Sequence, residues 1–200
     1  MGVPGVSAPS ANRFGRVSPT SAAHVAQEFG DALLVLDGGD CAVGIESTIV
    51  DTSRGRPVLL RPGVLTPAEL EAALGEPLHA ADAQAPRASG TLASHYAPRA
   101  RVRLLSRDRL VALLHTADTD GDAAAIGQPG GVAVYSRLAV AGRPGLRWRA
   151  MPDAPAAVAH ELFAVLRALD AEGVREIWVE QPPDGPAWDG VLDRLRRAAA

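Results

Sequence analysis

The second half of the chain alternates apolar runs of strand length with runs of helical spacing, and this order restricts the fold more than any other feature. The strand-like runs lie at 102–105, 131–135 and 176–180, and the helix-like runs lie at 107–115, 154–171 and 187–199. Strands that alternate with helices are typical of a largely parallel sheet with helices on its faces. We therefore expect an α/β fold in which residues 99–200 form one small domain.

The longest of these runs carries an apolar stripe. Its members recur three or four positions apart, as Val158, Leu162, Val165, Leu166 and Leu169. Side chains at that spacing share one face of a helix. The stripe therefore predicts a helix that packs against the sheet.

The first half of the chain begins with a loop and continues with a helix. Residues 3–16 are rich in Pro, Ser, Gly and Asn, without apolar periodicity. The segment 18–20 (SPT) then supplies a cap and a proline ahead of an apolar stripe at 22–29, and Gly30 supplies a stop. Strand candidates follow at 32–37, 44–51 and 57–60.

A second helix has clear signals at both ends. Thr66 and Glu69 form a capping box with Pro67 at the first helical position, and Gly75 ends the apolar stripe. Periodicity then disappears over 76–98, which is longer than most loops inside a domain. We place domains at 1–76 and 99–200, joined by a linker at 77–98.

Composition excludes several classes of protein. No apolar run approaches the roughly 20 residues of a membrane-spanning helix, and the first ten residues lack a secretion signal. These features predict no membrane partner and a cytoplasmic location. The net charge is −3, and neither half of the chain is strongly basic. Charge alone therefore gives no indication of non-specific nucleic-acid binding.

Nucleophilic and metal catalysis lack support in the sequence. The single cysteine, Cys41, has no evident His-Asp partner pattern, and the five histidines show no metal-ligand spacing. The standard phosphate-binding motifs GxxxxGK[ST] and GxGxxG are also absent. We therefore assign neither a catalytic nucleophile nor a metal ligand.

Polar residues near the first helix admit two interpretations. Ser10, Asn12, Ser18 and Thr20 surround a helix N-terminus, where backbone N–H groups and the helix dipole favour an anion. The same residues also serve simple capping and turn formation, which their spacing alone favours.

Further polar residues interrupt apolar segments downstream. Glu46, Ser47 and Thr48 lie in a strand-like stretch and face either solvent or a cavity. Arg61 follows an apolar run, where it lies on the surface or holds a phosphate. Tyr96 ends the linker, and it either closes over a cavity or fixes the linker in place.

Five segments in order resemble the threonylcarbamoyl-AMP synthase family of YrdC-type enzymes. They are APSANRFGRVSPTSA (8–22), LDGG (36–39), VGIESTIVD (43–51), LLRPG (59–63) and ASGTLASHYAP (88–98). The segments 161–183 and 190–199 resemble the end of the extra α/β domain of longer members, although Asp193 stands where the family usually has Asn. The resemblance implies the C-terminal part of a YrdC-like twisted α/β domain, a long linker and a small Rossmann-like α/β domain.

The activity implied by the resemblance consumes ATP, L-threonine and bicarbonate. Threonine and bicarbonate form a carbamate, which attacks the α-phosphate of ATP and releases pyrophosphate to give threonylcarbamoyl-AMP. The implied threonine contacts are Ser10 and Ser47, and the implied ATP contacts are Asn12, Thr20, Arg61 and Tyr96. Mg²⁺ is expected together with ATP. Such chemistry needs positioning and charge neutralisation more than it needs a nucleophile.

The resemblance also implies partners and leaves alternatives open. The product would feed threonylcarbamoyladenosine formation on tRNA by a downstream transferase, with tRNA or double-stranded RNA as a candidate partner. The family's catalytic domain starts well upstream of the segment 8–22, so we expect a truncated chain that lacks a basic triphosphate-binding motif. The alternative function is a non-catalytic remnant or a nucleotide- or RNA-binding module of the same fold. A hydrogenase-maturation carbamoyltransferase is a third and weaker alternative.

Overall fold

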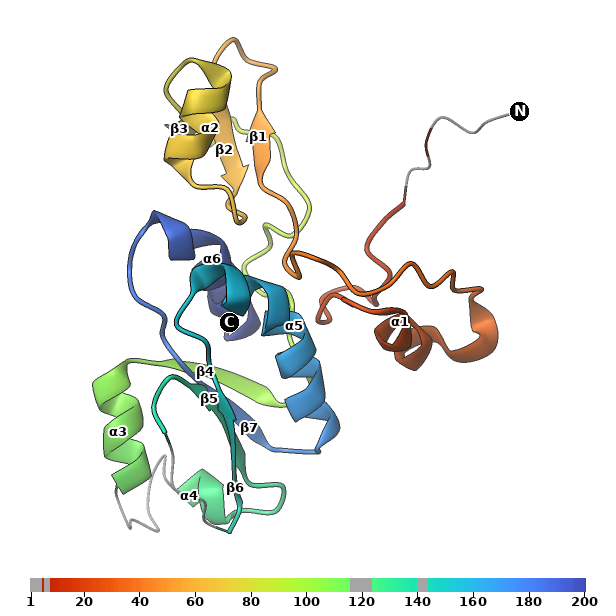
Figure 1. Cartoon of the computed structure of the whole chain (residues 1–200), viewed down its shortest axis with the longest axis vertical. Helices are drawn as coiled ribbons and strands as arrows, with labels where there is room; N and C mark the ends of the chain where they lie inside the picture. Colours follow the sequence, from red (N-terminus) through yellow and green to blue (C-terminus); the bar gives the residue numbers. More distant parts are fainter. Residues whose placement is uncertain (1–4, 6–7, 116–123, 140–143) are drawn as a thin grey trace.

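A computed structural model describes residues 5, 8–115, 124–139 and 144–200 (Figure 1). The described chain contains two sheets. The smaller sheet has the order β1 (Ile49–Asp51), β2 (Val58–Arg61) and β3 (His79–Ala80). The larger sheet has the order β4 (Arg101–Leu105), β7 (Glu176–Glu180), β5 (Val132–Ser136) and β6 (Leu146–Ala150).

All neighbouring strands of the larger sheet are parallel, which confirms the predicted mixed α/β fold with a parallel sheet. The helices α3 (Arg107–His115) and α4 (Ala124–Gly127) cover one face, and α5 (Pro155–Ala171) and α6 (Asp189–Ala198) cover the other. The unpredicted strand β6 lies at the edge and alternates apolar residues with arginine, so its sequence lacks the apolar run of a buried strand.

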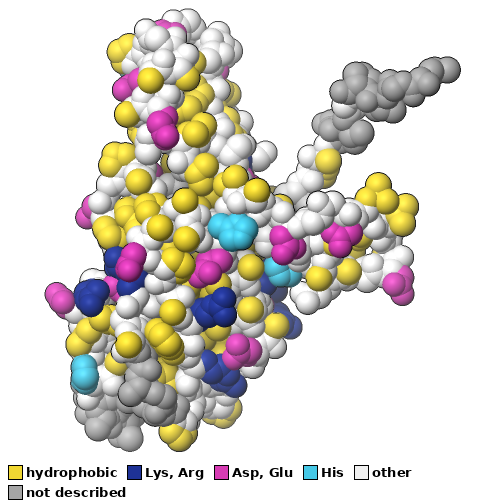
Figure 2. All heavy atoms as spheres, viewed as in Figure 1, with side chains coloured by type: hydrophobic (Ala, Val, Ile, Leu, Met, Phe, Trp, Pro, Cys, Tyr) yellow, Lys and Arg dark blue, Asp and Glu magenta, His cyan; other side chains and the backbone are white. Residues whose placement is uncertain are grey.

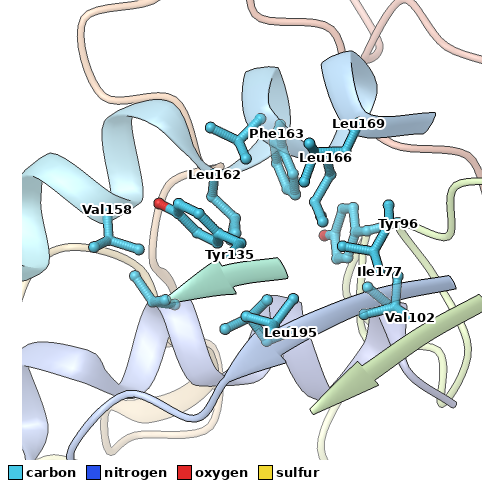
Figure 3. Packing of buried hydrophobic residues seen from close by; sticks show 14 of the residues in the cluster. Tyr96, Val102, Tyr135, Val158, Leu162, Phe163, Leu166, Leu169, Ile177 and Leu195 are labelled. Carbon is cyan, nitrogen blue, oxygen red and sulfur yellow. The ribbon is translucent and has the colours of Figure 1, made fainter. Parts of the chain in front are cut away.

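Helix α5 contributes most to the core between the helices and the sheet. The whole predicted stripe, Val158 to Leu169, is buried. Figure 3 shows Leu162, Phe163 and Leu166 of α5 facing Tyr135 of β5 and Ile177 of β7. Successive strand residues point to opposite faces, so alternate residues such as Val134 and Trp178 pack instead with the α3 and α4 side.

The smaller sheet combines one antiparallel and one parallel pairing. Strand β1 pairs antiparallel with β2, and β2 pairs parallel with β3. The strand expected at 57–60 is confirmed as β2, whereas only the last three residues of the expected strand 44–51 are in β1. The helix α2 (Pro67–Leu74) has the predicted capping box at Thr66 and a left-handed Gly75.

The first helix lies where the sequence predicts it, with a different cap. Helix α1 (Ala22–Phe29) ends at Gly30, and the hydroxyl of Ser21 accepts a hydrogen bond from the amide of His24 at 3.3 Å. The cap expected within 18–20 is therefore wrong, because the N-cap is Ser21. Pro19 precedes the helix instead of occupying its first turn.

The strand expected at 32–37 is also wrong. A 3-10 helix, η1 (Gly30–Ala32), is followed by irregular chain in which Leu34 and Leu36 are each 87% exposed. A strand needs a hydrogen-bonded neighbour, and no strand among the described residues pairs with this segment. Figure 2 shows hydrophobic side chains at the outer end of the lobe that contains α1.

The end of the predicted linker is fixed to the rest of the chain. Ala97 forms an isolated parallel bridge with Arg16, and the amide of His95 donates to the carbonyl of Arg197 at 3.1 Å. None of the described helices is long and apolar enough to cross a membrane.

Candidate functional site

A cavity of about 730 Å³ lies between the segment that precedes α1 and the segment that leads into β1. Its polar lining residues include Ser10, Ser18, Glu46 and Ser47. Its apolar lining residues include Cys41, Val43, Ile45, Val50, Val64, Leu65 and Leu70. The structure thus brings Ser10 and Ser47 into one cavity, although 37 positions separate them in sequence. Asn12, Thr20, Arg61 and Tyr96 do not line it.

Glu46 lines the cavity, and two donors hold its carboxylate in place. Ser18 Oγ donates to Glu46 Oε1 at 2.6 Å, and Arg194 Nε donates to Oε2 at 2.9 Å. Burial on its own would raise the pKa of Glu46, but these hydrogen bonds outweigh burial and lower the pKa below its ordinary value. The cavity therefore has an ionised carboxylate at neutral pH.

Asn12 and Thr20 make local contacts. Asn12 Nδ2 donates to the carbonyls of Arg13 and Arg16 at 3.0 Å each, which closes a turn, while its buried Oδ1 has no described partner. The backbone N–H of Thr20 donates to His24 Nδ1 at 3.2 Å. Burial lowers the pKa of His24, which favours the neutral ring that this contact needs. The structure thus places both residues in turn and capping roles.

Arg61 lies behind the cavity and supports its wall. The side chain is buried, and its Nε and Nη2 donate to the carbonyl of Ser47 at 3.1 and 2.9 Å. Nη1 donates to the carbonyl of Ser89 at 2.8 Å. Arg61 therefore connects the backbone of Ser47 to that of Ser89, and two of its five N–H groups remain outside these hydrogen bonds.

Tyr96 is 1% exposed and adopts a left-handed backbone with φ of 62°. Its ring stacks on Phe163 with centroids 5.2 Å apart and meets the His95 ring edge-on at 4.2 Å. Burial raises the pKa of its hydroxyl, which has no hydrogen-bond partner among the described residues. The left-handed backbone is uncommon for a side chain of this size, and residues in such strained conformations cluster at functional sites.

Arg194 contacts the cavity-lining residue Glu46, and no sequence motif had assigned it to the site. It belongs to α6, where it shares one helix face with Val191, Leu195 and Ala198, all buried. An arginine within an apolar stripe was the available signal, because a charge there must be paired on burial. No group of three or more metal-binding side chains occurs in the described ranges.

Two family models together match nearly the whole chain. Residues 65–200 match the model described as threonylcarbamoyl-AMP synthase, C-terminal domain, and residues 1–63 match one described as telomere recombination. The chain is 31% identical over 206 residues to the threonylcarbamoyl-AMP synthase of Pyrococcus abyssi and 32% identical over 205 residues to that of Bacillus subtilis. Each alignment covers 97% of this chain and 57% of the relative.

Solved structures give the same picture. The crystal structure of P. abyssi Sua5 complexed with L-threonine has a TM-score of 0.77 and 32% identity, and covers 96% of this chain and 56% of that one. A variant of P. abyssi Sua5 with consecutive histidine and tyrosine replaced by alanine gives a TM-score of 0.78 at 30% identity, with the same coverage. The chain thus spans little more than half the length of the relatives that it matches.

Proposed function

The chain belongs to the threonylcarbamoyl-AMP synthase family, and from this membership we propose that it contributes to L-threonylcarbamoyladenylate synthesis. In that reaction, bicarbonate and L-threonine condense to a carbamate and water. The carbamate oxygen then attacks the α-phosphate of ATP, and pyrophosphate leaves. Because the chain spans about 57% of the curated relatives, the proposal concerns the part of the site that these residues form.

The cavity, which both polar and apolar side chains line, carries the proposal. Threonine has a hydroxyl and two charged groups together with a methyl group. The hydroxyls of Ser10 and Ser47 would bind its polar groups, while Val43, Ile45 and Leu65 would contact its methyl group. The L-threonine complex of P. abyssi Sua5, a relative of the same fold, supports this assignment.

ATP would bind beside the threonine, in contact with Asn12, Thr20, Arg61 and Tyr96. The unpaired buried oxygens of Asn12 and Tyr96 support this assignment, because a ligand could satisfy both. The N–H groups of Arg61 that are outside its carbonyl contacts could reach a phosphate. Mg²⁺ would arrive with the nucleotide and neutralise phosphate charge. The only adjacent His-Tyr pair of this chain is His95-Tyr96, and such a pair was replaced in the P. abyssi variant.

The proposal extends to organisation and partners. Residues 1–76 would contribute to a YrdC-like catalytic domain, 77–98 would link it, and 99–200 would form a Rossmann-like domain. The product would pass to the machinery that transfers threonylcarbamoyl groups to tRNA. RNA binding by this chain would then matter less to its function than the synthesis of threonylcarbamoyl-AMP.

The test is threonine- and bicarbonate-dependent release of pyrophosphate from ATP by the folded chain, with circular dichroism on the same sample. We expect release that Ser47→Ala abolishes without loss of the folded signal. Exposed Thr52→Ala, which removes a hydroxyl outside the cavity, serves as the control. ATP binding without pyrophosphate release would favour the non-catalytic nucleotide-binding alternative, and absence of both ATP and threonine binding would contradict the proposal.

A further inference from the structure

Arg194 is fully buried, with 0% of its surface exposed, yet it contacts the cavity wall from the last helix. Nε donates to Glu46 Oε2 at 2.9 Å, and Nη2 donates to the carbonyl of Glu46 at 3.0 Å. Nη1 donates to the carbonyl of Pro62 and to Asp193 Oδ2, both at 2.8 Å. Four N–H groups are therefore paired, as a buried guanidinium requires.

These contacts lie next to residues assigned to substrates. Glu46 directly precedes Ser47, and Pro62 directly follows Arg61. Arg61 in turn donates to the carbonyl of Ser47, so the two arginines hold adjacent parts of the same pair of segments. Arg194 also lies over the ring of Tyr96, with its guanidinium carbon 5.5 Å from the ring centroid.

The backbone of α6 is positioned against the same segments. A Cβ on Gly190 would lie 2.3 Å from the carbonyl oxygen of Gly63, and a Cβ on Gly63 would lie 2.5 Å from the amide of Thr48. The first turn of α6, the turn after β2 and the Glu46–Thr48 wall are thus in close backbone packing. Displacement of α6 would move the wall of the cavity.

We propose that Arg194 is a positioning residue for the threonine subsite, through which the C-terminal helix fixes Glu46 and therefore the orientation of Ser47. This inference rests on the proposed function. It assigns a role in substrate binding to a residue that lies outside the cavity and about 150 positions along the chain from it. The C-terminal helix thereby becomes part of the machinery that recognises the amino acid.

The geometry needs arginine and not merely a positive charge. The three nitrogens of the planar guanidinium reach the Glu46 carboxylate, the Glu46 carbonyl and the Pro62 carbonyl together. A lysine ammonium is a single point charge and cannot span these acceptors at once. Arg194→Lys should therefore keep the charge and lose the orientation of Glu46.

The experiment compares Arg194→Lys with Arg196→Lys, a matched control at an exposed position of the same helix. Isothermal titration of the full chain with L-threonine and, separately, with ATP measures both affinities. We expect Arg194→Lys to weaken threonine binding roughly tenfold. ATP binding should weaken by less, through the altered contact with the Tyr96 ring, and Arg196→Lys should change neither affinity. If Arg194→Lys weakened the affinities for threonine and ATP equally, or only lowered the melting temperature, the role of Arg194 would be purely structural. Either result would overturn the proposal.

A second readout separates this inference from the proposed function. In amide NMR spectra of the ligand-free chain, Arg194→Lys should shift the resonances of Glu46, Ser47 and Thr48. If the lysine variant does not fold, Glu46→Gln replaces it and should shift the same resonances. Unmoved resonances would overturn the positioning role. A wild-type chain that binds no threonine would refute the proposed function and, with it, the subsite assignment.

Discussion

At the scale of single residues, several unpaired buried polar atoms lie in the segments of the proposed site. Buried atoms without a hydrogen-bond partner among the described residues include Asn12 Oδ1, Thr48 Oγ1, His95 Nδ1 and Tyr96 Oη. Each such atom costs roughly 1–3 kcal/mol relative to a satisfied one. Such unpaired atoms are best tolerated where a bound ligand supplies the missing hydrogen bond.

Tyr96→Phe tests this cost. Removal of an unpaired buried hydroxyl should raise the free energy of unfolding of the ligand-free chain by up to about 1 kcal/mol, while ATP binding weakens. Urea denaturation and ATP titration measure the two effects. The control is Tyr135→Phe, because the hydroxyl of Tyr135 donates to Glu161 at 2.9 Å. Tyr135→Phe should lower the free energy of unfolding by about 1 kcal/mol. A lower free energy of unfolding in Tyr96→Phe would contradict the view that its hydroxyl is unpaired.

The ionised Glu46 predicts a pH dependence of stability. Its folded pKa lies below its unfolded value, which is about 4.3 for glutamate. The unfolded state therefore binds the proton more tightly, so stability from this group is complete above about pH 5 and falls as the pH drops through 4. Melting temperatures from pH 3 to 7 should show a shallower acid decline in Glu46→Gln than in the wild type. Parallel declines would show that Glu46 does not contribute.

At the scale of elements, helices with local signals could be predicted from the sequence, and strands with remote partners could not. The helix bounded by Thr66 and Gly75 is confirmed at both ends, because capping and stop signals act within one turn. The helix expected at 107–115 is also present in the described residues. The strand expected at 32–37 failed because its apolar residues carry no information on a neighbouring strand. Edge strand β6 was missed for the opposite reason: it has a partner but little apolar pattern.

The unpaired segment after η1 should promote self-association. Leu34 and Leu36 expose most of their surface, and clustered apolar side chains of this kind favour aggregation. Replacement of both by serine should reduce oligomers in analytical ultracentrifugation and change the free energy of unfolding by less than about 0.5 kcal/mol. Buried Leu162→Ser is the contrast and should unfold the chain. An unchanged sedimentation profile would show that this segment does not drive association.

At the scale of the whole molecule, the site depends on contacts that join distant parts of the chain. Ser10 and Ser47 were assigned from local motifs that resemble a family, and the structure places them in one cavity. Arg194 could not be assigned in this way, because its partners Glu46 and Pro62 are more than 130 positions away. Sequence patterns identify the segments of the site, and only tertiary structure identifies what holds them together.

The close packing of α6 on the turn after β2 gives a test at this scale. Alanine normally favours a helix over glycine by about 1 kcal/mol, but a Cβ on Gly190 would collide with the carbonyl of Gly63. Gly190→Ala should therefore destabilise the chain by about 1–3 kcal/mol in urea denaturation. Gly127→Ala, at the end of α4 with open space around it, should be neutral or stabilising. Equal effects of the two substitutions would refute the close packing.

The distance of 148 positions between Glu46 and Arg194 has a consequence during protein synthesis. Chains grow from the N-terminus, so the motif segments leave the ribosome long before α6 does. Throughout that interval the contacts of Glu46 with Arg194 cannot form. Under the proposed function, a nascent chain would therefore reach full affinity for threonine only after α6 has been made.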